Sequence, residues 1–259
     1  MARTSIRLTI LLCLSFTSKY SEGLYLEGKI VEGEYVPILN YPHAVFLEMV
    51  NGDSSTHICG ASVLNQYYLV SVAHCFSTLD KNGKVTAFAG HENIKKAKVI
   101  RSGKPIIHSH FDIYTVENDI ALLLLDKPLP LGTQIQRVII KKNFPQALTG
   151  SVAGWGIINE VTEEETILLK SVKQSLKGRQ ECMQLDLKPG MFCAGSLKSS
   201  DPRPASGDSG SGLVTANYQL IGLVSYKLSM YSALPVYTNV SYYYKWIKHE
   251  TKSKFCSPK

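Results

Sequence analysis

Gly207-Asp208-Ser209-Gly210-Ser211-Gly212 is the stretch on which the interpretation of this chain depends. A serine stands between an acid and a glycine in a glycine-rich loop. Glycines permit a tight bend and close approach of another molecule to the backbone. They also let consecutive N–H groups point at one spot, as an anionic intermediate requires. Because Gly, Asp and Ser are ordinary turn residues as well, the stretch alone fits either a turn or an exposed nucleophile.

The chain on both sides of this stretch predicts an all-β fold. Short β-branched and aromatic runs recur between Gly, Pro and Asn, as they do in sandwiches and barrels. Helix spacing of apolar residues is confined to residues 242–254, where we expect a C-terminal helix. Examples of these expected strands are Ala44–Val50, Ala61–Val72, Lys84–Ala89, Ile120–Leu125, Ser151–Gly154, Gly212–Thr215, Gln219–Tyr226 and Pro235–Val240.

The N-terminal residues indicate export. Arg3 and Arg7 lead into a mostly apolar run over residues 8–16, which is typical of a secretory signal and too short to span a membrane. We therefore expect a signal peptide over residues 1–20 and a secreted, extracellular protein. The alternative is an N-terminal helix that packs in the core.

The mature chain would keep five cysteines in an oxidising compartment, where cysteines tend to pair. Their short spacings favour the pairs Cys59–Cys75 and Cys182–Cys193, which leaves Cys256 free or joined to another chain.

The charge is mildly basic. The formal charge is +7, and removal of residues 1–29, with four positive and two negative side chains, leaves +5. The lysines are spread out and are not interleaved with aromatic residues, which favours general adhesion to acidic surfaces over a dedicated nucleic-acid partner. Because no later stretch of about 20 apolar residues appears, we also expect no membrane partner.

Two distant residues could form a catalytic set with Ser209. His74 lies in Ser71-Val72-Ala73-His74-Cys75, and Asp119 directly precedes an apolar run. Each has a structural alternative, because a histidine at a strand end is often structural and an acid often caps a strand unless it is held inside by hydrogen bonds. Together they give the chain order His, Asp, Ser, which is one of three unrelated orders among serine hydrolases.

From Ile30 to about Phe255 the chain resembles the trypsin/chymotrypsin family of serine proteases. The resemblance implies two six-stranded antiparallel β-barrels packed together, with the active site between them and a C-terminal α-helix. The motifs that carry it, in order, are Ile30-Val31-Glu32-Gly33, Cys59-Gly60, Ala73-His74-Cys75, Asp119-Ile120-Ala121-Leu122, Ala153-Gly154-Trp155-Gly156, Met191-Phe192-Cys193-Ala194-Gly195, Gly207-Asp208-Ser209-Gly210 and Pro235-Val236-Tyr237-Thr238.

The family's chemistry assigns a role to each residue of the set. Ser209 attacks the peptide carbonyl and forms an acyl-enzyme. His74 accepts the serine proton, and Asp119 holds the imidazole in the useful tautomer. The N–H groups of Gly207 and Ser209 form the oxyanion hole. This chemistry requires no metal and no other cofactor.

The resemblance also implies a zymogen. An activating trypsin-like protease would cut after Lys29, so that residues 21–29 form a short activation propeptide and residues 30–259 the protease domain. The new ammonium of Ile30 would pair with Asp208 inside the protein, where a charge needs a partner. The alternative is that Lys29 is simply a surface lysine.

The candidate specificity pocket departs from the family pattern. Arg203 stands six residues before Ser209, where trypsins place the acid that selects Lys or Arg, although Asp201 could approach the pocket base instead. Lys227 and Pro235 replace glycines that keep the pocket open, and Ser225 precedes them. We expect specificity unlike that of trypsin, with small or acidic side chains preferred, because unpaired buried positive charge favours a carboxylate.

The leading hypothesis is a secreted, monomeric serine endopeptidase that acts on protein or peptide substrates and meets protein inhibitors. The competing hypothesis is a non-catalytic serine protease homologue that binds or regulates other proteins, and the altered pocket favours it. The complete set of His74, Asp119 and Ser209 favours the enzyme. A lectin-like β-sandwich would account for the strands but for none of the motifs.

Overall fold

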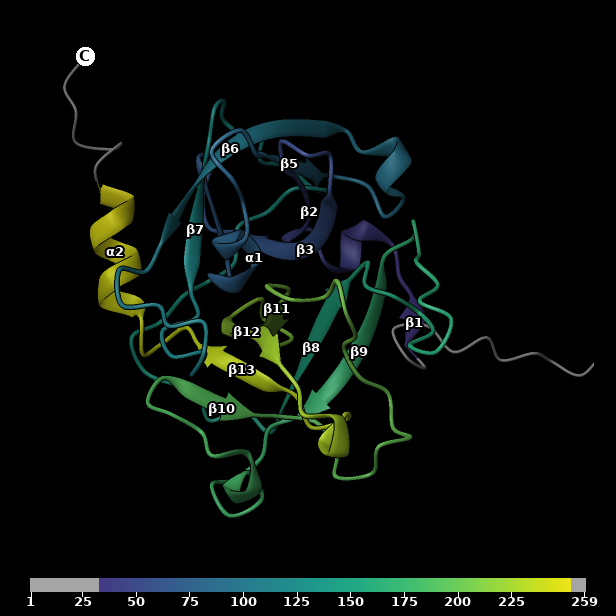
Figure 1. Cartoon of the computed structure of the whole chain (residues 1–259), viewed down its shortest axis with the longest axis vertical. Coiled ribbons are helices and arrows are strands. Elements are labelled where there is room, and N and C mark those ends of the chain that lie inside the picture. The colour runs from purple at the N-terminus through teal and green to yellow at the C-terminus, as the bar shows by residue number, and fades with distance from the viewer. Residues whose placement is uncertain (1–32, 253–259) are drawn as a thin grey trace, which may run out of the picture.

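The structure is a computed structural model that describes residues 33–252; the predicted signal peptide, Lys29, Ile30 and Cys256 lie outside this range. The chain forms two β-rich halves that pack on each other, and the C-terminal helix α2 (Tyr244–Lys252) stands beside the first half (Figure 1). None of the helices in the described range is long and apolar enough to cross a membrane.

The first half is a closed barrel of six antiparallel strands. The last strand in the ladder pairs with the first, which closes the barrel. In ladder order the strands are β2 (Ala44–Val50), β3 (Thr56–Val63), β4 (Tyr68–Ser71), β7 (Ala121–Leu125), β6 (Val99–Ile107) and β5 (Lys84–Ala89); the short helix α1 (His74–Ser77) follows β4, and η1 (Ile38–Asn40) and η2 (Ile94–Lys96) are 3₁₀ turns.

The second half is a seven-stranded antiparallel sheet. In ladder order its strands are β1 (Glu34–Tyr35), β9 (Lys170–Ser175), β8 (Thr149–Gly154), β11 (Gly212–Val214), β12 (Leu220–Tyr226), β13 (Val236–Asn239) and β10 (Met191–Cys193), with 3₁₀ turns η3 (Met183–Leu185) and η4 (Ser229–Tyr231).

The six strands from β9 to β10 also close on themselves. The N–H of Lys177 donates to the carbonyl of Cys193 at 3.1 Å, and that of Gly195 donates to the carbonyl of Ser175 at 2.8 Å. These bonds join the end of β9 to the end of β10, and β1 is an added edge strand on β9. The predicted fold class is therefore confirmed.

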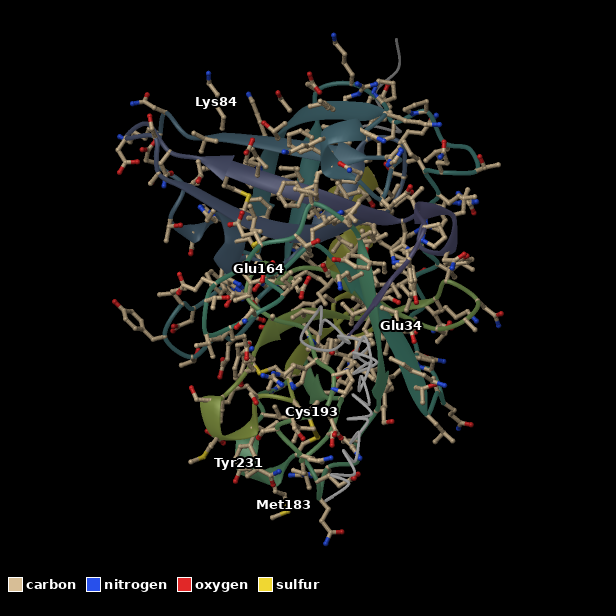
Figure 2. The ribbon with its side chains drawn as sticks, turned by 90° about the vertical axis from the view of Figure 1, so that its right-hand side faces the viewer. Glu34, Lys84, Glu164, Met183, Cys193 and Tyr231 are labelled. Carbon is tan, nitrogen blue, oxygen red and sulfur yellow. A yellow bond between two sulfur atoms is a disulfide. The ribbon has the colours of Figure 1, made fainter. Side chains whose placement is uncertain are left out.

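An apolar cluster holds the two halves together. Phe46 from the first barrel packs edge-on against Trp155, which follows β8, and Ile38 and Ala153 are buried beside them. The Trp155 ring N–H donates to the carbonyl of Glu92 at 2.8 Å, so this large side chain buries its apolar body without leaving its polar atom unpaired. In Figure 2, Lys84 and Met183 mark opposite ends of the molecule, above and below the boundary between the halves.

The strand predictions agree with the structure at β2 and β5 and fail at one run that contains a turn. The bounds of β2 and β5 are those predicted, whereas the prediction of one strand over Ala61–Val72 is wrong. The chain turns there because the side chain of Asn65 accepts from the N–H groups of Tyr67 and Tyr68 at 2.8 and 3.0 Å, and an Asn that bonds ahead in this way makes a turn.

Candidate active site

His74 and Asp119 lie at the same end of the first barrel because their strands are neighbours. Strands β4 and β7 pair with Ser71 opposite Ala121, so the residues that follow β4 and precede β7 come together. The Asp119 Oδ2 atom lies 2.8 Å from Nδ1 of His74, and Oδ1 accepts from the His74 backbone N–H at 2.9 Å. The predicted His–Asp pairing is thus present in the geometry.

Two hydroxyl groups from the second half hold Asp119. Ser225 Oγ donates to its Oδ2 at 2.6 Å, and Thr238 Oγ1 donates to its backbone carbonyl at 2.7 Å. The Asp119 side chain is only 1% exposed. A buried carboxylate is tolerated when hydrogen bonds replace its water, and here these bonds come from both halves of the molecule.

A bulge in β12 aims Ser225 at Asp119. The pairing of β12 with β13 shifts register between Val224 and Tyr226, so that Ser225 is the extra residue. A bulge bends a strand locally and redirects a side chain, often next to a functional site. The sequence assigned Ser225 to the pocket wall, but it did not reveal this bond, and it assigned Thr238 no role.

The backbone of the Ser209 loop spans the boundary between the halves. The carbonyl of Ser209 accepts from the N–H of Gly60 in the first barrel at 2.7 Å, and the N–H of Gly210 donates to Val224 in the second half at 2.8 Å. The sulfur of Cys75, the residue after His74, lies 3.8 Å from the same Ser209 carbonyl. Within residues 33–252, no hydrogen bond joins the Ser209 hydroxyl to the ring of His74.

Two backbone N–H groups beside Ser209 are available to a ligand. Gly207 has a φ of +89°, a left-handed conformation that side chains disfavour. In the described part of the chain, the N–H groups of Gly207 and Ser209 donate to no protein acceptor. Adjacent free donors of this kind are suited to stabilising an oxyanion.

Asp208 points away from these donors into the protein. Its Oδ1 accepts from the N–H of Gly156 and its Oδ2 from the N–H of Ala205, both at 2.9 Å. Burial raises the pKa of Asp208 to about 6, against the lowering effect of those two bonds. The predicted partner of this carboxylate, Ile30, lies outside the described residues.

A cavity of about 270 Å³ opens beside Ser209. The predicted pocket residues Ser225, Lys227 and Pro235 line it, whereas Arg203 does not. The cavity is also lined by Pro204, Ala205, Ser206, Val224 and Tyr226. The pocket is therefore small, and its lining combines apolar side chains with three serines and Lys227.

The two cations near this cavity are paired, which corrects the expectation of unpaired positive charge. The carboxylate of Glu160 binds Arg203 Nη2 at 2.7 Å, and its other oxygen pairs with the Lys227 ammonium. Asp201, the alternative pocket acid, lies 3.6 Å from Lys198 instead. Nothing in the sequence marked Glu160, because it is 43 residues from Arg203 and lies in an irregular loop.

Both predicted disulfides are present. Cys59–Cys75 joins β3 to helix α1 directly beside His74, and Cys182–Cys193 joins the residue before η3 to the end of β10. Figure 2 shows Cys193 inside the second half. The first disulfide therefore braces the segment that carries the histidine of the site.

Comparisons with known proteins agree with this fold. The family model described as Trypsin matches residues 30–247. Trypsin Blo t 3 from Blomia tropicalis is 28% identical over 239 residues, which is 88% of each chain. Trypsin from Sus scrofa is 29% identical over 86% of this chain and 95% of that protein. Trypsin-2 from Salmo salar is 31% identical over 77% of this chain and 84% of its own length.

Solved structures share the architecture. The structure titled "Structure of GrC" has a TM-score of 0.76 and 24% identity, and the match covers 85% of this chain and 98% of that one. The scabies mite inactivated protease paralogue S-D1 has a TM-score of 0.75 and 23% identity over 86% of this chain and 97% of its own. With the family model matched over most of its length, this chain belongs to the trypsin family of serine proteases.

Proposed function

We propose that this protein is a secreted serine endopeptidase that hydrolyses peptide bonds through an acyl-enzyme. The observation that carries the proposal is the buried Asp119 carboxylate, which binds His74 at two points next to the Ser209 loop. A non-catalytic protein has no evident need for a charged group held at this cost in the interior.

Each residue of the site has a chemical role in this proposal. Ser209 Oγ attacks the substrate carbonyl while Nε2 of His74 takes its proton, and the same nitrogen later returns a proton to the leaving amine. Asp119 keeps the His74 proton on Nδ1 and stabilises the imidazolium. The N–H groups of Gly207 and Ser209 receive the oxyanion, and each such donor contributes roughly 10²–10³ in rate.

Activation would follow cleavage after Lys29 by a trypsin-like protease. The ammonium of Ile30 would then pair with Asp208, which has no cationic side-chain partner among residues 33–252. A buried carboxylate with a raised pKa gains from a nearby positive charge. The disulfides fit the oxidising conditions that a secreted protein meets.

The substrates would be proteins cut after small side chains. The cavity beside Ser209 holds only about 270 Å³, and its lining of small prolines, alanine and serines includes Lys227 but no carboxylate. A long cationic side chain would therefore meet like charge and no partner. Protein inhibitors that insert a loop at the same place are also expected.

The proposal is tested by cleaving purified protein after Lys29 and incubating it with a mixture of peptides that is analysed by mass spectrometry. Hydrolysis that is absent from a Ser209→Ala control would support it. A folded, cleaved protein that releases no products would favour the non-catalytic homologue. That outcome has to be tested because one structural neighbour is described as an inactivated protease.

A further inference from the structure

A single carboxylate joins the two cations near the pocket. Glu160 binds Arg203 Nη2 at 2.7 Å through Oε2 and pairs with the Lys227 ammonium through Oε1. The three side chains are between 11% and 27% exposed, so solvent screens them only in part. Arg203 also donates to the carbonyl of Ser199 at 2.7 Å, which fixes its guanidinium.

The loop that carries Glu160 is well braced. The N–H of Ile158 donates to the carbonyl of Glu164 at 2.7 Å, and the Asn159 side chain accepts from Val161 N–H at 2.9 Å. At the base of the loop, the N–H of Ile157 donates to the carbonyl of Ser206, a residue that lines the pocket, at 2.8 Å. In Figure 2, Glu164 marks this loop at the level where the two halves meet.

The position of Lys227 connects this cluster to the substrate. Lys227 is the charged residue among those lining the cavity beside Ser209, and Pro204, the neighbour of Arg203, lines it as well. A substrate carboxylate entering the cavity would have to compete for the Lys227 ammonium with Glu160. Because Glu160 is tethered in the same chain, its effective concentration exceeds that of any free substrate.

We propose that Glu160 is a specificity-determining residue: by pairing with Lys227 and Arg203 it makes the pocket select small neutral side chains and reject acidic ones. The inference rests on the proposed protease function. It follows that removal of the Glu160 charge alone converts the pocket into one that accepts a carboxylate. The neutral amide of Glu160→Gln keeps the shape of the side chain but cannot balance the cations.

The test compares cleaved wild-type protein, Glu160→Gln and the control Glu165→Gln, which lies exposed in the same loop. Peptide substrates differ only in having Ala or Asp before the cleaved bond. We expect the Asp-to-Ala ratio of kcat/KM to rise about tenfold in Glu160→Gln and to stay unchanged in Glu165→Gln. High salt should reduce the gain, and Glu160→Gln combined with Lys227→Gln should abolish it.

A merely structural role for Glu160 would give a different result. If kcat/KM falls equally for both peptides, or the ratio is unchanged, the inference is wrong. Calorimetry can also measure the dissociation constants of the two product peptides, which end in Ala or Asp. Their ratio reports the same preference without turnover. If no peptide is hydrolysed but the binding ratio shifts in Glu160→Gln, the protease function is refuted and the role of Glu160 is supported. If peptides are hydrolysed but the ratio does not shift, the protease function is supported and the role of Glu160 is refuted.

Discussion

Asp119 holds His74 at two points, through the ring Nδ1 at 2.8 Å and through the backbone N–H at 2.9 Å. Two bonds from one carboxylate fix both the position and the rotation of the imidazole. A carboxylate accepts, so the ring donates from Nδ1 and leaves Nε2 as an acceptor. This is the tautomer that removes a proton from a hydroxyl.

Replacing Asp119 with Asn should therefore lower kcat by about 10⁴, the magnitude known for this change in a related triad. The amide can donate to Nδ1, which places the wrong tautomer opposite the serine. Steady-state hydrolysis of a peptide substrate measures the effect. A loss of less than tenfold, in a variant whose thermal unfolding is unchanged, would show that this aspartate does not set the tautomer.

Ser225→Ala should destabilise the fold and slow turnover together. The variant loses the 2.6 Å bond to the buried Asp119 carboxylate, and a hydrogen bond to a charged group contributes about 1.5–3 kcal/mol. Urea unfolding gives the free-energy change, with the exposed Ser229→Ala as the matched control. If both variants unfold at the same urea concentration, the Ser225 hydroxyl contributes nothing to the stability of the site.

Asp208 should make the uncleaved protein less stable as the pH rises. Its pKa is raised by burial from 3.8 to about 6, so the unfolded carboxyl loses its proton at a lower pH than the folded one. The resulting stability is fully present below pH 3.8 and is lost as the pH rises through about 6. The total change is about 3 kcal/mol.

Denaturant unfolding of the uncleaved protein between pH 4 and 7 measures this effect. Asp208→Asn has no titrating group at this position and should give a flatter curve. Parallel curves for the two proteins would mean that this carboxyl does not titrate in the window.

Gly156→Ala should disturb the Asp208 loop. A Cβ at this position would lie 2.5 Å from Asp208 Oδ2 and 2.7 Å from the carbonyl of Ser206. Overpacking of this kind costs typically about 1–3 kcal/mol, and it would displace the carboxylate that lies next to Ser209. We expect kcat/KM to fall by more than the loss in the free energy of unfolding alone would explain. Gly132→Ala, which has open space around it, should change neither quantity. Equal activity in the two variants would contradict this account.

Local sequence patterns predicted strands only where the residue composition itself favours a strand. Strands β2 and β5 consist mostly of apolar and β-branched residues, with Glu48 and Lys84 as the exceptions, and were predicted with their observed bounds. Strand β6 contains Arg101, Gly103 and Pro105 and is not among the example runs, because its pairing with β5 and β7 decides its structure. Tertiary context overrides propensity in such a strand.

The residues of the site also fall into those that local motifs predict and those that depend on tertiary structure. Motifs near His74, Asp119 and Ser209 predicted the set that the structure brings to the boundary between the halves. The bulge at Ser225 depends on register with a distant strand, and the Glu160 pairing depends on where an irregular loop lies. Neither contact has a signal in the nearby sequence, so neither could be predicted without the three-dimensional structure.

Covalent labelling shows whether Ser209 is an activated nucleophile. Protein cleaved after Lys29 is treated with a fluorophosphonate, and the adduct is located by intact-mass and peptide mass spectrometry. Labelling needs the nucleophile, its base and the oxyanion hole, but little from the pocket. We expect one adduct, on Ser209, that is lost in His74→Ala although the serine remains. Folded, cleaved protein that carries no adduct, or carries it on another residue, would contradict this expectation.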